Sequence, residues 1–122
     1  MSKFTEMDRT VTLADQLKDE GGQVVLVNTL VVPSEDADRL LAVWAADAAI
    51  MKRQPGFIST QLHRGIAGSG TFLNYAVWET VAHFRAAFTN PEFRARLAEY
   101  PDSMTTSPHL FRSVAVPGIC VA

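Results

Sequence analysis

Two polar side chains stand out because each lies in an otherwise apolar segment. Asn28 interrupts the apolar run over residues 23–32, and Trp78 lies near the end of the aromatic-rich segment over residues 72–79. A buried amide can donate a hydrogen bond to an oxygen that gains negative charge during a reaction. An indole can stack on a flat ring while its N–H binds an oxygen. These two residues are therefore the best indication of chemistry in the chain.

Each of these features also has a purely structural interpretation. A single asparagine in a strand is more often a core or edge amide whose hydrogen bonds are satisfied, and Trp78 alone is as well explained as a core indole. Trp44 is most simply a core residue on one face of a helix. His63, His83 and His109 are available as bases if the chemistry requires one.

Composition indicates a single globular domain. The chain has 122 residues, 48% of them hydrophobic, and a formal net charge of −2. It has no basic run to suggest nucleic acid and no apolar stretch of about 20 residues to span a membrane. The charged N-terminus does not resemble a secretion signal, and the single Cys120 cannot form an internal disulfide. We therefore expect a cytoplasmic protein with neither nucleic acid nor a membrane as partner.

Motifs for other kinds of site are missing from the sequence. It has no phosphate-binding loop, nucleophile elbow, paired-carboxylate arrangement or His/Cys cluster. Glu79 and Glu92 are each explained by the start of a helix, where negative charge is favourable. We therefore expect no metal site.

The first half of the chain predicts an extension, a strand and a helix. Residues 1–22 are interpreted as an N-terminal extension with one short helix that ends at Gly21-Gly22, ahead of a single domain over residues 23–122. Two roles remain open for the extension: covering the mouth of a pocket, or extending a dimer contact. The β-branched run over residues 23–32 predicts a strand. Ser34 then caps a helix that ends before Pro55-Gly56, with an apolar stripe of Leu40, Leu41, Trp44, Ala48 and Met51.

The second half predicts two paired strands, a helix in two parts and a last strand. Residues 57–64 and 71–79 form a hairpin, in which alternation places Ile58, Thr60 and Leu62 on one face and Phe57, Ser59, Gln61 and His63 on the other. Thr80 caps a helix that restarts at Asn90-Pro91. Residues 101–108 are predicted to be a loop and residues 110–116 the last strand.

This order of elements predicts an α+β fold, the ferredoxin-like βαββαβ antiparallel sheet with both helices on one face. Its first and third strands should be central, so Asn28 and Trp78 lie on neighbouring strands. The strand over residues 23–32 is apolar on both faces, whereas two helices cover only one face of a sheet. We therefore predict a homodimer in which two sheets pack face to face.

Two motifs carry a resemblance to a known family. The patterns QPGFIS-x-x-LHR from residue 54 and FLNYAVWE-x-x-x-HF from residue 72, in this order of elements, resemble the antibiotic biosynthesis monooxygenase (ABM) family. The resemblance covers about residues 23–116 and implies a dimeric α+β barrel. The family includes several chemistries on one scaffold, so the fold alone does not identify the reaction.

Within this family the chain is most similar to the quinone-forming anthrone oxygenases. These enzymes pair an Asn on the first strand with a Trp at the end of the third, and they use no metal, flavin or haem. The resemblance assigns those positions to Asn28 and Trp78. Haem-degrading members add a histidine late in the second helix, but residues 92–100 contain none and His83 lies too early in that helix. Haem binding and a non-catalytic dimer that binds a hydrophobic metabolite are the alternatives.

The resemblance implies a cofactor-free monooxygenase that converts an anthrone-like aromatic polyketide to a quinone with O2. Asn28 would stabilise the enolate oxygen, and Trp78 would stack on the rings. The hypothesis requires a pocket beneath the helices that is large enough for three fused rings and lined by Asn28 and Trp78. It is weakened if side chains fill that space. The residues expected to contact substrate are Trp44, Met51, Phe57, His63, Phe72, Phe84, Phe88 and His109.

Overall fold

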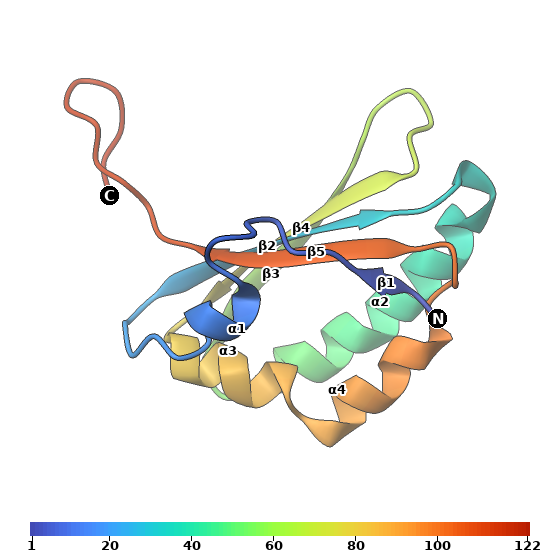
Figure 1. The fold of residues 1–122 in the computed structure, drawn as a ribbon, viewed down its shortest axis with the longest axis horizontal. Coiled ribbons are helices and arrows are strands. Elements are labelled where there is room, and N and C mark those ends of the chain that lie inside the picture. Colours follow the sequence, from blue (N-terminus) through green and yellow to red (C-terminus); the bar gives the residue numbers. More distant parts are fainter.

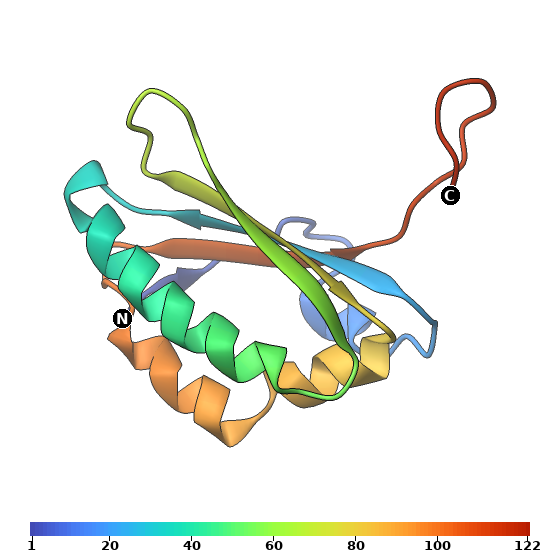
Figure 2. The same ribbon diagram turned by 180° about the vertical axis from the view of Figure 1, so that it is seen from behind.

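A five-stranded sheet covered by helices on one face forms the body of the protein (Figure 1 and Figure 2). The computed structural model describes all residues from Met1 to Ala122. The elements in chain order are β1 (Lys3–Phe4), α1 (Leu13–Gln16), β2 (Val24–Val31), α2 (Ala37–Lys52), β3 (Phe57–Arg64), β4 (Thr71–Trp78), α3 (Val81–Phe88), α4 (Pro91–Arg96) and β5 (Thr105–Phe111), with single 3₁₀ turns at Ser34–Asp36 and Leu97–Glu99.

The strand order is β1-β5-β2-β4-β3, and every pairing is antiparallel except that of β1 with β5. Without β1 and the one-turn α1, the remaining elements follow the predicted βαββαβ order, with the second helix divided into α3 and α4. Strands β2 and β4 are central neighbours, as predicted, and Asn28 lies directly opposite Asn74 in their register. The ferredoxin-like α+β fold is therefore confirmed. None of the helices combines the length and the apolar character needed to cross a membrane.

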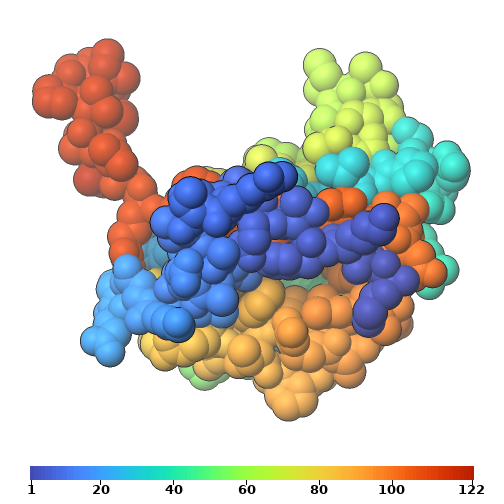
Figure 3. Space-filling model, in the orientation of Figure 1, coloured from blue at the N-terminus to red at the C-terminus, as the bar shows by residue number.

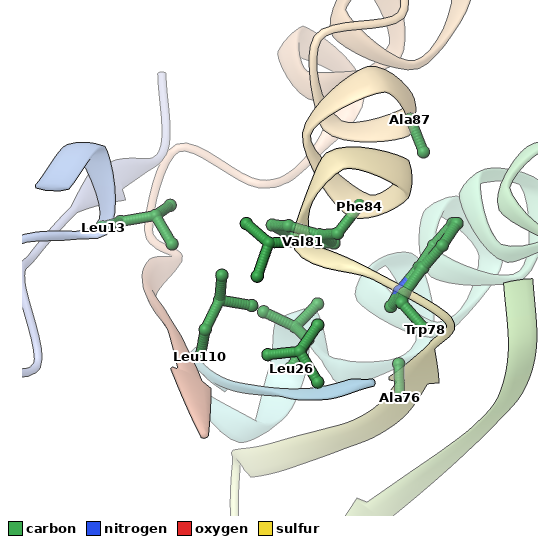
Figure 4. Packing of buried hydrophobic residues seen from close by; sticks show 9 residues of the cluster. Leu13, Leu26, Ala76, Trp78, Val81, Phe84, Ala87 and Leu110 are labelled. Carbon is green, nitrogen blue, oxygen red and sulfur yellow. The ribbon is translucent and has the colours of Figure 1, made fainter. Parts of the chain in front are cut away.

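The N-terminal residues are part of this fold. Strand β1 extends the sheet beside β5, and α1 begins at a Thr12 cap whose hydroxyl accepts a hydrogen bond from the Asp15 backbone. The helix ends at Gln16 with Leu17 as its C-cap, so the prediction that Gly21-Gly22 closes it was wrong. Asp15 completes a capping box, which fixes the start of this one-turn helix. Leu13 of α1 is buried against the core (Figure 4).

The last strand differs from the predicted one. It covers Thr105–Phe111, whereas residues 112–115 form no strand and the chain end projects away from the body (Figure 1). Residues 105–108, which were predicted to belong to a loop, are part of this strand, although proline cannot donate a hydrogen bond to a sheet. The Asn28 side chain instead accepts the N–H of neighbouring Ser107, at 3.1 Å, which helps to hold this part of the strand.

A bulge in β3 changes which side chains face the helices. The register of β3 with β4 shifts between Phe57 and Ser59. As a result Phe57, Thr60 and Leu62 each pair with a residue of β4 that faces the helices, and they face the helices as well. The strict alternation predicted for this strand therefore fails at its first two residues, since Ile58 is exposed. The bulge brings the Phe57 ring to 5.4 Å from the Trp78 ring, edge to face.

The space between sheet and helices holds two hydrophobic clusters. One lies beneath α3 and includes Leu26, Trp78 and Phe84 (Figure 4). The other lies beneath α2 and includes Leu30, Leu40 and Phe72. Asn28 lies on β2 between Leu26 of the first cluster and Leu30 of the second. The polar side chain is therefore placed where the two clusters meet.

Candidate active site

Two adjoining cavities lie under the helices. The inner cavity has a volume of about 80 Å³, is mostly apolar and is lined by both Asn28 and Trp78. The outer cavity, of about 460 Å³, lies between the N-terminal residues and α4, and it is also lined by Asn28. The two cavities share six lining residues, and they meet at Asn28, Leu30, Phe88, Phe93, Tyr100 and Pro108.

The asparagine pair is the polar centre of the inner cavity. The Oδ1 of Asn28 accepts the Thr106 hydroxyl at 2.8 Å and the Ser107 N–H at 3.1 Å. On the neighbouring strand, the Oδ1 of Asn74 accepts the Thr60 hydroxyl at 2.6 Å. Each carbonyl oxygen is thus bonded to the next strand of the sheet, β5 for Asn28 and β3 for Asn74, and neither NH₂ group has a partner within the chain. Two adjacent amide donors are left for an oxygen atom in the cavity.

Trp78 contributes a third donor without a partner. Its side chain is 1% exposed, and its Nε1 is buried without any hydrogen-bond acceptor. Most buried polar groups are hydrogen-bonded, so an unpaired indole N–H in a cavity wall is a specific feature of this site. Edge contacts with Phe57 and Phe84 fix the ring. The inner cavity therefore combines apolar walls with unpaired donors.

A buried carboxylate lies at the other side of the inner cavity. Asp47 of α2 is 3% exposed, and Arg96 Nε lies 3.3 Å from its Oδ1 without the alignment of a hydrogen bond. Burial raises the pKa of Asp47 above its ordinary value, and the neighbouring Tyr100 hydroxyl and Arg96 guanidinium oppose this rise only in part. Burial, together with the charge of Asp47, also raises the pKa of the Tyr100 phenol, which therefore stays protonated. Both side chains line the inner cavity.

Five of the eight residues expected to contact substrate line the inner cavity. They are Trp44, Met51, Phe57, Phe84 and Phe88. Phe72 does not reach it, because its fully buried ring packs in the cluster beneath α2. His63 and His109 do not reach it either. In the sheet register His63 pairs with Leu73 and His109 pairs with Val27, and these partners lie on the face of the sheet without helices, so both histidines lie on that face too.

The three histidines are engaged elsewhere. His63 is exposed, with Nδ1 3.3 Å from the Leu73 carbonyl oxygen. The Nε2 of His109 is 3.1 Å from the Gln16 amide nitrogen, and the Nδ1 of His83 is 2.7 Å from the Thr80 hydroxyl. None lines either cavity, so no imidazole is placed there as a base or as a haem ligand. No group of three or more His, Cys, Asp or Glu side chains is arranged to hold a metal ion.

The sequence prediction did not include Asn74, Asp47 or Tyr100 as site residues. Asn74 lies four residues before Trp78, so strand alternation already places both on one face. Asp47 lies three residues after Trp44 on the apolar stripe of the α2 helix, a position that indicates burial. Tyr100 follows the last helical turn, and no pattern in the sequence points to it.

The predicted pocket, large enough for three fused rings and lined by both Asn28 and Trp78, is not present as a single cavity, because Trp78 lines only the inner one. Trp44, Met51 and Phe84 take up much of the space beneath the helices, and the remaining 80 Å³ is too small for three fused rings. Sites for molecules of that size usually measure about 300–1,000 Å³. The outer cavity lies within that range and reaches Asn28, so a ring system could lie across the junction with one edge at the asparagine pair.

Comparison with known proteins identifies the family. The family model for the antibiotic biosynthesis monooxygenase matches residues 23–99. The chain is 32% identical over 90 residues to deoxynogalonate monooxygenase from Streptomyces nogalater, a match that spans 74% of this chain and 75% of that protein.

A comparison with solved structures supports the same family. The structure of SnoaB, a cofactor-independent oxygenase from Streptomyces nogalater, matches at 28% identity with a TM-score of 0.71, over 80% of this chain and 99% of that one. A conserved protein of unknown function from Bacteroides thetaiotaomicron, 11% identical with a TM-score of 0.67 over 74% of this chain and 96% of its own, shares the fold alone. The chain therefore belongs to the antibiotic biosynthesis monooxygenase family, and it is a monooxygenase.

Proposed function

We propose that this monooxygenase oxidises an anthrone-like polycyclic aromatic to a quinone with O2 and without a cofactor. The observation that carries the proposal is the set of free donors around the inner cavity, namely the NH₂ groups of Asn28 and Asn74 and the N–H of Trp78. Its relatives support the same chemistry, since one is named a deoxynogalonate monooxygenase and another a cofactor-independent oxygenase.

The reaction balances without an external reductant. The methylene carbon of an anthrone loses two hydrogens, one atom of O2 becomes the new quinone oxygen, and the other leaves as water. Loss of the first proton gives an enolate, which can pass an electron to O2 directly. The protein then has to hold a flat ring, stabilise the enolate oxygen and exclude bulk water.

The asparagine pair suits the second of these tasks. Two neutral donors in an apolar cavity stabilise a developing oxyanion without adding a charge that must itself be buried, and one such donor contributes roughly 2.7–4 kcal/mol to catalysis. The indole N–H of Trp78 is then available for the peroxide formed on the adjacent carbon. The aromatic walls, including Phe57, Phe84 and Phe88, suit a planar substrate.

The proposal includes a homodimer. On the helix-free face of the sheet, β2 and β4 present apolar side chains, among them Val25, Val27, Leu73 and Val77. Tyr75 on the same face is 45% exposed in the single chain. A second copy of the sheet would cover this surface, in keeping with the face-to-face packing of β-sheets.

Oxygen uptake by metal-stripped protein with dithranol, a simple anthrone, tests the proposal. Asn28→Asp is the sharpest variant, because an ionised Asp still accepts from Thr106 and Ser107 but cannot donate. We expect uptake above autoxidation in the wild type and a loss of about 10²–10³-fold in the variant.

Gln23→Glu provides the matched control, because it makes the same amide-to-acid change at an exposed residue that lines neither cavity. We expect it to retain wild-type uptake. Wild-type uptake no faster than buffer would reject the oxygenase proposal, and full activity in Asn28→Asp would reject the role of the amide donor.

A further inference from the structure

The N-terminal residues form the distal wall of the outer cavity. Its lining residues that are absent from the inner cavity include Phe4, Leu13, Ala14 and Leu17. Figure 3 shows these blue N-terminal residues lying across the molecule above α4, with a recess between the two. The match to the family model starts at residue 23, so these wall residues lie outside the matched region.

This wall is firmly attached. Backbone bonds of 2.8 and 2.9 Å join Lys3 to Met104 and Thr5 to Thr106. The Gln16 side chain binds β5 like a further strand, because its amide nitrogen donates to the Leu110 carbonyl and its oxygen accepts the Leu110 N–H, each at 2.9 Å. The N-terminal wall of the outer cavity is therefore fixed to β5 by hydrogen bonds.

The lining of the outer cavity indicates what it can bind. Its walls are aliphatic and aromatic, and they include Phe4, Leu17, Phe93 and Leu97. Three charged groups lie at its edge, and each already has a partner. The Glu6 carboxylate accepts the Leu13 N–H, and the exposed Arg94 stacks on Phe88. The N-terminal ammonium pairs with Asp102. The lining therefore favours a neutral apolar group.

We propose that the outer cavity is a second substrate subsite, which binds a further fused ring or an apolar side chain of an anthrone whose reacting ring lies at Asn28. This inference rests on the proposed function for the identity of the ligand. Its geometric basis is independent: the larger cavity reaches Asn28 where it joins the inner cavity, and its distal end lies at Ala14 and Leu17. We expect a three-ring substrate with its reacting ring at Asn28 to leave that distal end unfilled. The enzyme should therefore prefer anthrones longer than three rings.

Binding of unreactive quinones tests the subsite separately from catalysis. The probes are the quinone products of a three-ring and a linear four-ring anthrone, titrated against the intrinsic tryptophan fluorescence. We expect the four-ring quinone to bind about tenfold more tightly to the wild type, because the additional ring is removed from water. Ala14→Phe, which fills the distal end, should abolish this preference.

Ala82→Phe is the matched control, because Ala82 is exposed on α3 and lines neither cavity. It should keep the tenfold preference. Phe4→Ala removes part of the wall without adding bulk and should reduce the preference for the four-ring quinone. This variant provides the test if Ala14→Phe does not fold. Equal binding of both quinones to the wild type, or a preference that survives in both variants, would overturn the subsite.

The same experiment separates the two proposals. A four-ring preference that Ala14→Phe abolishes supports the subsite even if neither anthrone is oxidised, and in that case only the proposed function fails. Rapid oxygen uptake with dithranol together with equal quinone affinities overturns the subsite and leaves the oxygenase function standing.

Discussion

Asn28 shows how one side chain can have a structural and a chemical role together. Its carbonyl oxygen holds Thr106 and Ser107 beside Pro108, where β5 lacks a backbone donor. Its NH₂ group is consequently turned to the cavity and has no partner. The structural interpretation of this residue and the catalytic one are therefore compatible, since they concern different atoms. Fixing the amide by its oxygen also orients the donor before a substrate binds.

Asp47 allows a prediction on stability and pH. Burial raises the pKa of Asp47 in the folded protein. The Asp47 side chain therefore contributes most to the free energy of unfolding below its ordinary pKa of 3.8, where it is protonated in both states. This contribution is lost as pH rises through the pKa of the folded protein. Asp47→Asn removes the ionisation. The free energy of unfolding of the variant relative to wild type should therefore increase with pH, by on the order of 1 kcal/mol between pH 3.5 and 7.5.

Urea denaturation of both proteins across this pH range measures the difference. Glu20→Gln, at an exposed acid outside the helices, is the control and should change the free energy of unfolding by less than about 0.5 kcal/mol at each pH. A difference for Asp47→Asn that decreases with pH would mean that Arg96 stabilises the carboxylate more than burial penalises it.

At the scale of the element, α1 is too short to be stable by itself. A single helical turn has little intrinsic stability, so its position depends on tertiary contacts. Leu13→Ala removes a side chain that is 3% exposed and contacts the core cluster beneath α3. We expect a loss of about 2–4 kcal/mol in the free energy of unfolding, measured by urea denaturation. Val11→Ala, at an exposed neighbour, should cost under about 0.5 kcal/mol.

Equal effects of these two substitutions would show that the N-terminal segment is loosely held. In that event the distal wall of the outer cavity would lack the rigidity that its hydrogen bonds indicate. Amide hydrogen exchange at Leu110, whose N–H is bonded to Gln16, reports on the same contact without a change of sequence.

The order of elements could be predicted from sequence because its signals are local. The Thr80 and Asn90 caps and the Pro55-Gly56 turn each act within a few residues, and the structure contains all of them. Two predictions for α2 were wrong: Leu41 is exposed, and the Ser34 hydroxyl donates to the Gly68 carbonyl and does not cap the helix. Gly56 has φ of +84°, a conformation that suits glycine at the start of β3. The misplaced last strand and the bulge at Ile58 depend on partners far away in the chain, and local patterns do not report them.

At the scale of the whole molecule, the site could be predicted only where it follows from the sheet. The inner cavity forms between two central strands and the helices that cover them, so Asn28 and Trp78 could be placed there from the topology. The outer cavity requires residues 1–17 to return to β5 through the β1 pairing and the Gln16 side chain. Neither contact has a signature in the sequence, because both are made by isolated residues.

The face of the sheet opposite the helices leads to a last prediction, on assembly. It is apolar along β2 and β4, and both the loop over residues 65–70 and the chain end project on that side (Figure 1 and Figure 2). The chain end carries Val114, Ile119 and Val121, each more than 70% exposed. So much exposed apolar surface on one side indicates a protein–protein interface. We expect a dimer at micromolar concentration by light scattering coupled to size-exclusion chromatography.

Tyr75→Glu should convert this dimer to a monomer that keeps its fold, because Tyr75 is half-exposed in the single chain and a pair of buried carboxylates would repel each other across the interface. Leu41→Glu is the control, since this residue is exposed on α2 in the helical layer. A wild type that elutes as a monomer, or a Tyr75→Glu variant that remains dimeric, would contradict face-to-face packing. If the variant is a folded monomer that still binds quinones, the two cavities are complete within one chain, as their lining residues indicate.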